Sequence, residues 1–313
     1  MLKYLIIPLR ADAVSFCHYA PGKDSDLIDL DVLKKALLWS MQQNLTVQFI
    51  YPDEPLPPEY KTVIETVDHA DIVGIGCRAT TLQNDIIVIN GWRAVDKSRL
   101  EKDRNYVIRT TFSELLANKE TLKDILPAVT RLVIVITDIS SISETDLEKY
   151  RTLLDSLVPV VKELYATGHA VQFNLLTDRM LLESMNNCNA GVESITLAPD
   201  GRFYICPAFY LDGSQSVGDV ASGPQIPNQL LYRLDHAPIC RNCDAWQCRR
   251  CVWLNRHMTL EVNTPSREQC VASHLERNAS RALLSEIRKL GTFLPGNEIP
   301  EIDYLDPFDK LNK

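Results

Sequence analysis

The sequence has no long hydrophobic run. The longest apolar stretch near its start, residues 4–9, is interrupted by Pro8 and closed by Arg10, and it is too short for a membrane span or a signal-peptide core. Positive charge is also scarce: 33 Lys and Arg stand against 41 Asp and Glu, a net charge of −8. Nucleic acid and anionic lipid repel such a chain. We therefore expect a cytoplasmic protein with no membrane and no nucleic-acid partner.

The first 187 residues alternate short β-branched runs with longer segments of helical period. This alternation is typical of successive βα units around a parallel sheet. Residues 132–136 are all apolar, as expected for a strand that helices cover on both faces. The predicted fold class is α/β, a partial (β/α) barrel, although the pattern alone also fits a doubly wound sheet. The predicted strands are residues 3–9, 47–51, 72–75, 86–90, 106–109, 131–137 and 170–175.

Helix signals are clearest in the second half of this region. Ser143 and Asp146 have the spacing of a capping box, and Gly168 provides a suitable C-terminal stop. Further helices are predicted over residues 31–44 and 58–67, and Thr111 with Glu114 marks another helix start. A last helix is expected over residues 271–290.

Cysteine is concentrated in the last third of the chain. Seven of the nine cysteines lie between residues 188 and 270, whereas Cys17 and Cys77 stand apart. In a reducing compartment such cysteines serve metals or catalysis more often than disulfides. The change of composition after Asn187 predicts an α/β domain over residues 1–187 and a small cysteine-rich domain with a C-terminal helix over residues 188–290. Residues 291–313 are predicted to form an extended tail.

The cysteine spacings predict metal ligation. Pro199-Asp200-Gly201 should form a tight turn that brings Cys188 and Cys206 together on adjoining strands. Two residues separate the cysteines of each later pair, which lets both thiolates face one ion or cluster. A zinc site would explain the later cysteines alone. Iron-sulfur chemistry would use all seven: Cys188, Cys206, Cys240, Cys243, Cys248, Cys251 and Cys270.

This region resembles a SPASM domain, the auxiliary-cluster module of many radical S-adenosylmethionine enzymes that mature peptides. The resemblance implies two 4Fe-4S clusters. Cys240, Cys243, Cys248 and Cys270 would close one, and Cys188, Cys206 and Cys251 would hold the other. The loops around Trp246 are shorter than the family pattern, so we expect their shape to differ. Besides the seven cysteines, the resemblance rests on Gly191, Pro199-Asp200-Gly201, Tyr204, Pro207 and Gly218-Asp219-Val220.

The α/β part lacks residues that such enzymes use. Their C-x3-C-x2-C motif after the first strand corresponds here to Cys17, Pro21 and Asp24, so thiolates for a catalytic cluster are missing. Their Gly-Gly-Glu-Pro after the second strand is replaced by Pro52-Asp53-Glu54-Pro55, which restricts the backbone. The resemblance therefore implies a degenerate radical S-adenosylmethionine domain, and we do not expect S-adenosylmethionine to be cleaved.

The combined pattern, including Phe16-Cys17-His18-Tyr19, is similar to the Cxxx repeat peptide maturases, relatives associated with ribosomally made cysteine-repeat peptides. The resemblance implies a cysteine-rich precursor peptide as partner, with substrate ligation or electron transfer as the role. Whether the chain is itself an enzyme stays open. The rival hypotheses are a noncatalytic adaptor folded by zinc or a cluster, and an electron carrier for a separate radical enzyme. That enzyme or a reductant would then be a partner.

Seven cysteines leave one iron of two such clusters without a cysteine, because two closed clusters need about eight. The eighth ligand could be water, a cysteine of the peptide, or a distant residue such as Cys17 or Cys77. The peptide cysteine is the favoured hypothesis from sequence, because thiolate is a strong iron ligand.

Overall fold

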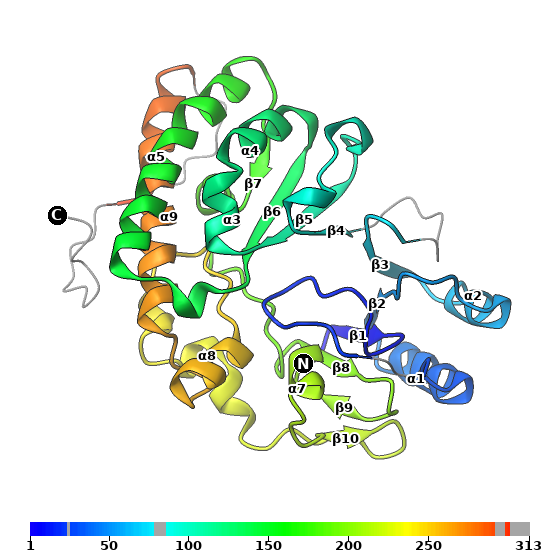
Figure 1. The fold of residues 1–313 in the computed structure, drawn as a ribbon. Helices are drawn as coiled ribbons and strands as arrows, with labels where there is room; N and C mark the ends of the chain where they lie inside the picture. Colours follow the sequence, from blue (N-terminus) through cyan, green and yellow to red (C-terminus); the bar gives the residue numbers. More distant parts are fainter. Residues whose placement is uncertain (24–25, 78–85, 292–297, 301–313) are drawn as a thin grey trace.

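The structure is a computed structural model, and it describes residues 1–23, 26–77, 86–291 and 298–300. A curved nine-stranded sheet forms its centre, and helices lie on the outer side of the sheet (Figure 1). The strands are β1 Tyr4–Pro8, β2 Thr46–Ile50, β3 His69–Gly74, β4 Ile86–Asn90, β5 Asn105–Thr110, β6 Arg131–Ile136, β7 Gln172–Phe173, β8 Ser194–Leu197 and β9 Phe203–Tyr204. A separate hairpin pairs β10 Gly218–Asp219 with β11 Gly223–Pro224.

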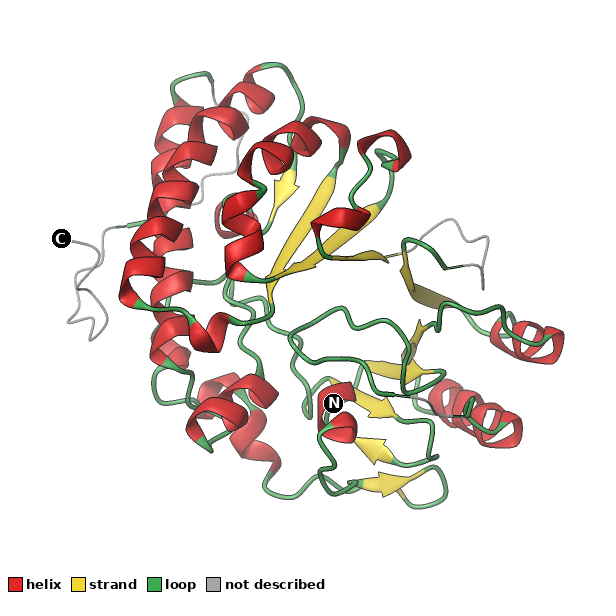
Figure 2. Cartoon of the chain, viewed as in Figure 1, coloured by secondary structure: helices red, strands yellow, loops and turns green. Residues whose placement is uncertain are grey.

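The strand order shows how the sheet is wound. It runs β7-β6-β5-β4-β3-β2-β1-β8-β9, so the first seven strands follow one another in chain order, and all their pairings are parallel. A doubly wound sheet would reverse its order near the middle. The predicted α/β partial barrel is confirmed, and the doubly wound alternative is wrong (Figure 2).

Strand β6 illustrates why these segments form the sheet. Leu132, Ile134 and Ile136 point to the outer core under the helices, whereas Val133 and Val135 belong to the core on the inner face. All five are at most 5% exposed. A strand covered on both faces needs apolar residues at every position, which is the pattern found here.

The helices begin where local signals predict. Both capping boxes, Ser143 with Asp146 and Thr111 with Glu114, are present, and Gly168 adopts a φ of +83° just after the longest helix. The helices are α1 Leu30–Gln42, α2 Pro58–Ile64, α3 Phe112–Ala117, α4 Lys119–Ile125, α5 Glu144–Ala166, α6 Asp178–Leu181, α7 Pro207–Leu211, α8 Val252–Thr259 and α9 Arg267–Arg288.

Helix α9 starts four residues earlier than predicted, because Ser266 caps it by accepting a hydrogen bond from the Gln269 backbone N–H. Cys270 therefore lies in its first turn. The helix packs along α5, with Tyr150 donating to Glu276 at 2.7 Å. Beyond the predicted boundary at residue 187, β8 pairs with β1 and continues the barrel sheet. The division into domains stays a prediction.

The predicted tail, residues 291–313, lies mostly outside the described residues. In its described part Ile299 is 4% exposed and belongs to the core around α5 and α9. Glu298 forms an ion pair with Arg288 at 2.6 Å. Among the described helices, none has both the length and the apolar character needed to cross a bilayer.

Candidate metal centre

The β8–β9 hairpin carries the first two predicted ligands, Cys188 just before β8 and Cys206 just after β9. Gly201 makes the predicted turn with a φ of +79°, and the Tyr204 hydroxyl donates to the Asp200 carboxylate at 2.7 Å across it. Ser194 donates to the Cys188 carbonyl at 3.0 Å. Burial raises the pKa of Cys206, and the charge of Cys188 adds to this effect, so the hairpin brings the two thiols within electrostatic reach of each other.

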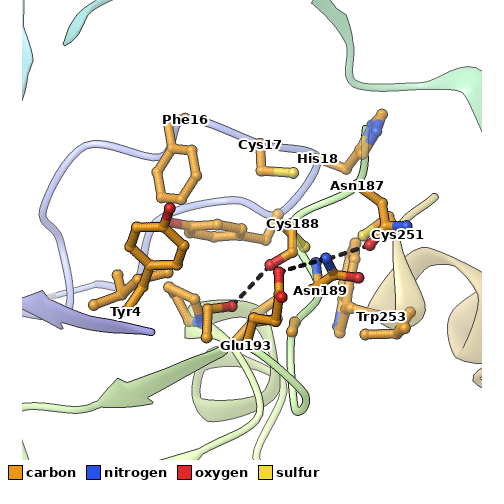
Figure 3. Close-up of a pocket in the computed structure, with 18 of the residues that line it drawn as sticks. Tyr4, Phe16, Cys17, His18, Asn187, Cys188, Asn189, Glu193, Cys251 and Trp253 are labelled. Carbon is orange, nitrogen blue, oxygen red and sulfur yellow. Dashed lines mark hydrogen bonds between the residues drawn. The ribbon is translucent and has the colours of Figure 1, made fainter. Parts of the chain in front are cut away.

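Four cysteines line one cavity of about 400 Å³ between the loop after β1, the β8–β9 hairpin and the start of α8 (Figure 3). Three of them are the predicted set Cys188, Cys206 and Cys251. The fourth is Cys17, which sequence reasoning had kept only as a distant alternative. The remaining wall combines aromatic and amide side chains, including Phe16, Tyr19, Gln48, Asn187 and Trp253.

Cys17 and Cys251 contact each other through their side chains. The Cys251 thiol donates to the Cys17 sulfur and, with the nearby His18, lowers the pKa of Cys17, whereas the same contact and burial raise the pKa of Cys251. Cys251 is also the N-cap of α8, where its sulfur accepts from the Leu254 backbone N–H at 3.5 Å.

The loop that carries Cys17 is fixed by hydrogen bonds to the barrel. Arg109 of β5 donates from Nε to the Cys17 carbonyl at 2.8 Å and from Nη2 to the Tyr19 carbonyl at 2.7 Å. His18 Nδ1 lies 3.1 Å from the carbonyl oxygen of Ile136, at the end of β6. These contacts span the mouth of the barrel, so the position of Cys17 is set by the sheet.

A second group contains Cys240, Cys243 and Cys248. The Cys243 N–H donates to the Cys240 carbonyl at 3.1 Å, closing the turn between these two residues. Burial raises the pKa of Cys248 to about 12, with smaller contributions from the charges of Cys243 and Cys240. The three thiols therefore lie within electrostatic reach of one another.

Helix α9 presents Cys270 on the side that faces this group. Cys248 interacts with Ser273, and the Cys243 sulfur lies 3.6 Å from Nε2 of His274. Residues three and four positions apart share a helix face. Cys270 therefore shares its face with Ser273 and His274, as the predicted four-cysteine set requires.

Two consecutive arginines lie between the two cysteine groups. Arg249 interacts with Cys17 and Cys188, and Arg250 interacts with Cys240, Cys188 and Cys248. Arg250 is 2% exposed, and its Nη1 donates to the Tyr232 carbonyl at 3.0 Å. Its Nε and Nη2 are buried and make no hydrogen bond of normal geometry within the described residues.

These observations bear on the implied clusters. A cube of four irons takes one thiolate at each iron, so its ligands surround a cavity and do not converge on a single ion. Around the cavity stand four thiols, and the positive charge of Arg249 and Arg250 suits the negative charge of thiolate-bound clusters. In the described part of the chain, no three His, Cys, Asp or Glu side chains are grouped so as to hold one metal ion. The donor set fits a four-iron cluster.

The loop after β1 packs into the inner side of the barrel. Ala13 and Val14, from the loop after β1, pack against Ile6, Ile50 and Val107 on the inward faces of the strands. The Val14 N–H donates to the Tyr51 carbonyl at 3.2 Å. The loop therefore occupies the mouth and part of the interior of the barrel.

Two residues of this centre were not favoured candidates from the sequence, Cys17 and His274. Cys17 was only one of several alternatives for the eighth ligand, because the sequence does not show that β8 returns beside β1. His274 lies one helical turn after Cys270, a spacing visible in sequence.

The fold, a partial barrel with a cysteine-rich C-terminal region and a final helix, is like that of radical S-adenosylmethionine enzymes. No family model matches the sequence, and a search of curated proteins finds no match. The chain is similar to native anSMEcpe with bound AdoMet and the Cp18Cys peptide, with a TM-score of 0.60 and 11% identity over 93% of this chain and 100% of that one. It is also similar to Streptococcus suis SuiB bound to its precursor peptide SuiA, with a TM-score of 0.51 and 10% identity over 85% and 75%. At such identities the likeness establishes the fold alone.

Proposed function

We propose that this chain is an iron-sulfur protein that binds a cysteine-repeat precursor peptide and assists its maturation. The observation that carries the proposal is a cavity lined by four cysteines, in a barrel whose fold is shared with structures that hold peptides. Clusters bound by the two cysteine groups would supply electron transfer. The buried Arg250, which interacts with cysteines of both groups, would offset their negative charge.

The proposal excludes cleavage of S-adenosylmethionine by this chain. The loop after β1 has one cysteine, and its thiol faces Cys251 at the far wall of the cavity. Its apolar residues fill part of the barrel interior, where Ala13 and Val14 are 4% and 7% exposed. Anaerobic incubation with S-adenosylmethionine and dithionite should therefore give no 5′-deoxyadenosine, and its appearance with the pure protein would contradict the proposal.

The first test is metal analysis of the anaerobically purified protein. Two four-iron clusters would give about eight irons and eight sulfides per chain. Zinc in whole-number ratio with no sulfide would instead support the adaptor hypothesis, in which metal serves only to fold the cysteine-rich region.

The second test is peptide binding by fluorescence anisotropy, with a peptide carrying cysteine at every fourth position and a scrambled peptide of equal composition. The repeat peptide should bind more tightly. Gln48→Leu removes an amide from the cavity wall without touching a cysteine, and we expect affinity for the repeat peptide to fall about three- to tenfold, the effect of one hydrogen bond. Gln172→Leu changes an exposed glutamine of β7 and should have no effect. Equal binding of both peptides would refute the proposed partner.

A further inference from the structure

The cavity contains one thiol more than the cysteine-rich region supplies. Cys188, Cys206 and Cys251 come from that region, whereas Cys17 comes from the loop after β1. The Cys17 side chain contacts that of Cys251, and all four residues line the same cavity, in which Figure 3 labels Cys17, Cys188 and Cys251. Three thiols leave one iron of a four-iron cluster open, and four close it.

We infer that Cys17 is the fourth protein ligand of the cluster that Cys188, Cys206 and Cys251 hold. The inference rests on the proposed function, because it presupposes a cluster at this place. Each of the four thiols would lose its proton and bind one iron, with no oxidation or reduction of the protein. A cysteine of the peptide is then not needed to close the cluster, in contrast to the hypothesis favoured from sequence.

Hydrogen bonds fix the backbone around Cys17, as expected for a loop that carries a metal ligand. Its carbonyl and that of Tyr19 both accept from Arg109, and Ser15 donates to the Tyr19 carbonyl at 2.6 Å. With the backbone fixed to β5, the thiol does not have to be ordered when a cluster binds, which lowers the entropic cost of ligation.

Charge supports the same assignment. Besides Asp178, the partly buried side chain of Arg249 interacts with Cys17 from the loop after β1 and with Cys188 from the cysteine-rich region. A guanidinium between two prospective thiolates stabilises their charged forms. The charge of Arg249 therefore acts on Cys17 and on a cysteine of the cysteine-rich region alike.

Cys77 provides a matched control. It also follows a strand of the barrel, but its thiol donates to the Pro52 carbonyl at 3.4 Å. Within the described chain it is not among the residues that line the cavity. Cys77→Ser therefore removes a thiol from the barrel without removing a proposed cluster ligand.

The experiment compares the anaerobically purified full-length protein with Cys17→Ser and Cys77→Ser. We expect Cys17→Ser either to lose up to about half of the iron and sulfide, four irons of eight, or to keep its iron with one open site. In the second case dithiothreitol or imidazole should change its electron paramagnetic resonance spectrum. Wild-type protein and Cys77→Ser should keep full iron and give spectra that do not respond to these ligands.

Mössbauer spectroscopy of wild-type protein loaded with ⁵⁷Fe decides the question even if Cys17→Ser does not fold. Closed clusters contain only thiolate-bound irons, so we expect no distinct iron site. One distinct site of about eight, or a wild-type spectrum that responds to added thiol as Cys17→Ser does, would overturn the inference. Absence of iron and sulfide from wild-type protein would instead refute the proposed function.

Discussion

Asp244 is predicted to hold the cysteine-rich region against α9. It lies between Cys243 and Cys248. Arg277 Nε donates to its two carboxylate oxygens at 3.1 and 3.0 Å, and Arg179 Nη2 lies 3.7 Å from Oδ2 of the same carboxylate. Both arginines are 1% exposed, and Arg179 stacks over Trp246 at 3.9 Å. Asp244→Ala would leave two buried guanidinium groups without a carboxylate. A buried charge without its partner costs about 3–5 kcal/mol.

Urea denaturation followed by circular dichroism measures this loss, and two further variants locate its cause. Asp235→Ala removes an exposed carboxylate from its ion pair with Arg233, and its unfolding free energy should equal that of the wild type within error. Asp244→Ala combined with Arg277→Met removes both charges and should recover part of the loss. A change below about 1 kcal/mol in Asp244→Ala would refute the reasoning, because it would mean that the arginines are satisfied without this carboxylate.

Three more predictions concern pH, a turn and the loop at the barrel mouth. Burial raises the pKa of Glu276 to about 7, so the folded state keeps a proton that the unfolded state loses between pH 4.5 and 7. The unfolding free energy should fall by about 1–3 kcal/mol across this window, and denaturation curves of Glu276→Gln should lack this fall. Gly218 has a φ of +120°, and an added Cβ would meet a backbone oxygen at 2.2 Å, so Gly218→Ala should lower the melting temperature, whereas Gly76→Ala, with no atom within 4 Å, should not. Arg109→Ala should speed amide hydrogen exchange around Cys17, because two of the hydrogen bonds that hold the loop are lost; unchanged exchange would show that these bonds do not restrain it.

Features set by neighbouring residues could be predicted from sequence. The capping boxes at Ser143 and Thr111 and the turn at Gly201 depend on a few residues each, and all three occur as predicted. Strand β4, Ile86–Asn90, matches its predicted bounds because its apolar run is continuous. The start of α9 was placed too late because the apolar stripe begins at Val271, whereas the helix is started by the polar cap Ser266.

The composition of the metal centre was harder to predict, because it depends on the order of strands in space. The return of β8 to the side of β1 brings the cysteine hairpin beneath the loop that carries Cys17. Sequence spacing contains no information on that pairing, so both Cys17 and Cys77 remained candidates, although Cys77 beside Gly76 was more simply a core thiol at a strand end. The structure separates them: Cys17 lines the cavity, and Cys77 donates to Pro52 elsewhere.

The loop after β1 accounts for two proposed differences between this chain and the radical enzymes whose fold it resembles: the loss of S-adenosylmethionine cleavage and the closure of the cluster by Cys17. With Pro21 in place of a second cysteine, the loop cannot be organised by a cluster of its own. It is organised by the protein instead: Val14 packs into the barrel, and Arg109 and His18 tie its backbone across the mouth. This arrangement turns the one remaining thiol toward Cys251. The contacts that fill the barrel interior therefore also place Cys17 among the cysteines of the cavity, so that one loop conformation accounts for both the proposed loss of S-adenosylmethionine cleavage and the inferred closure of the cluster.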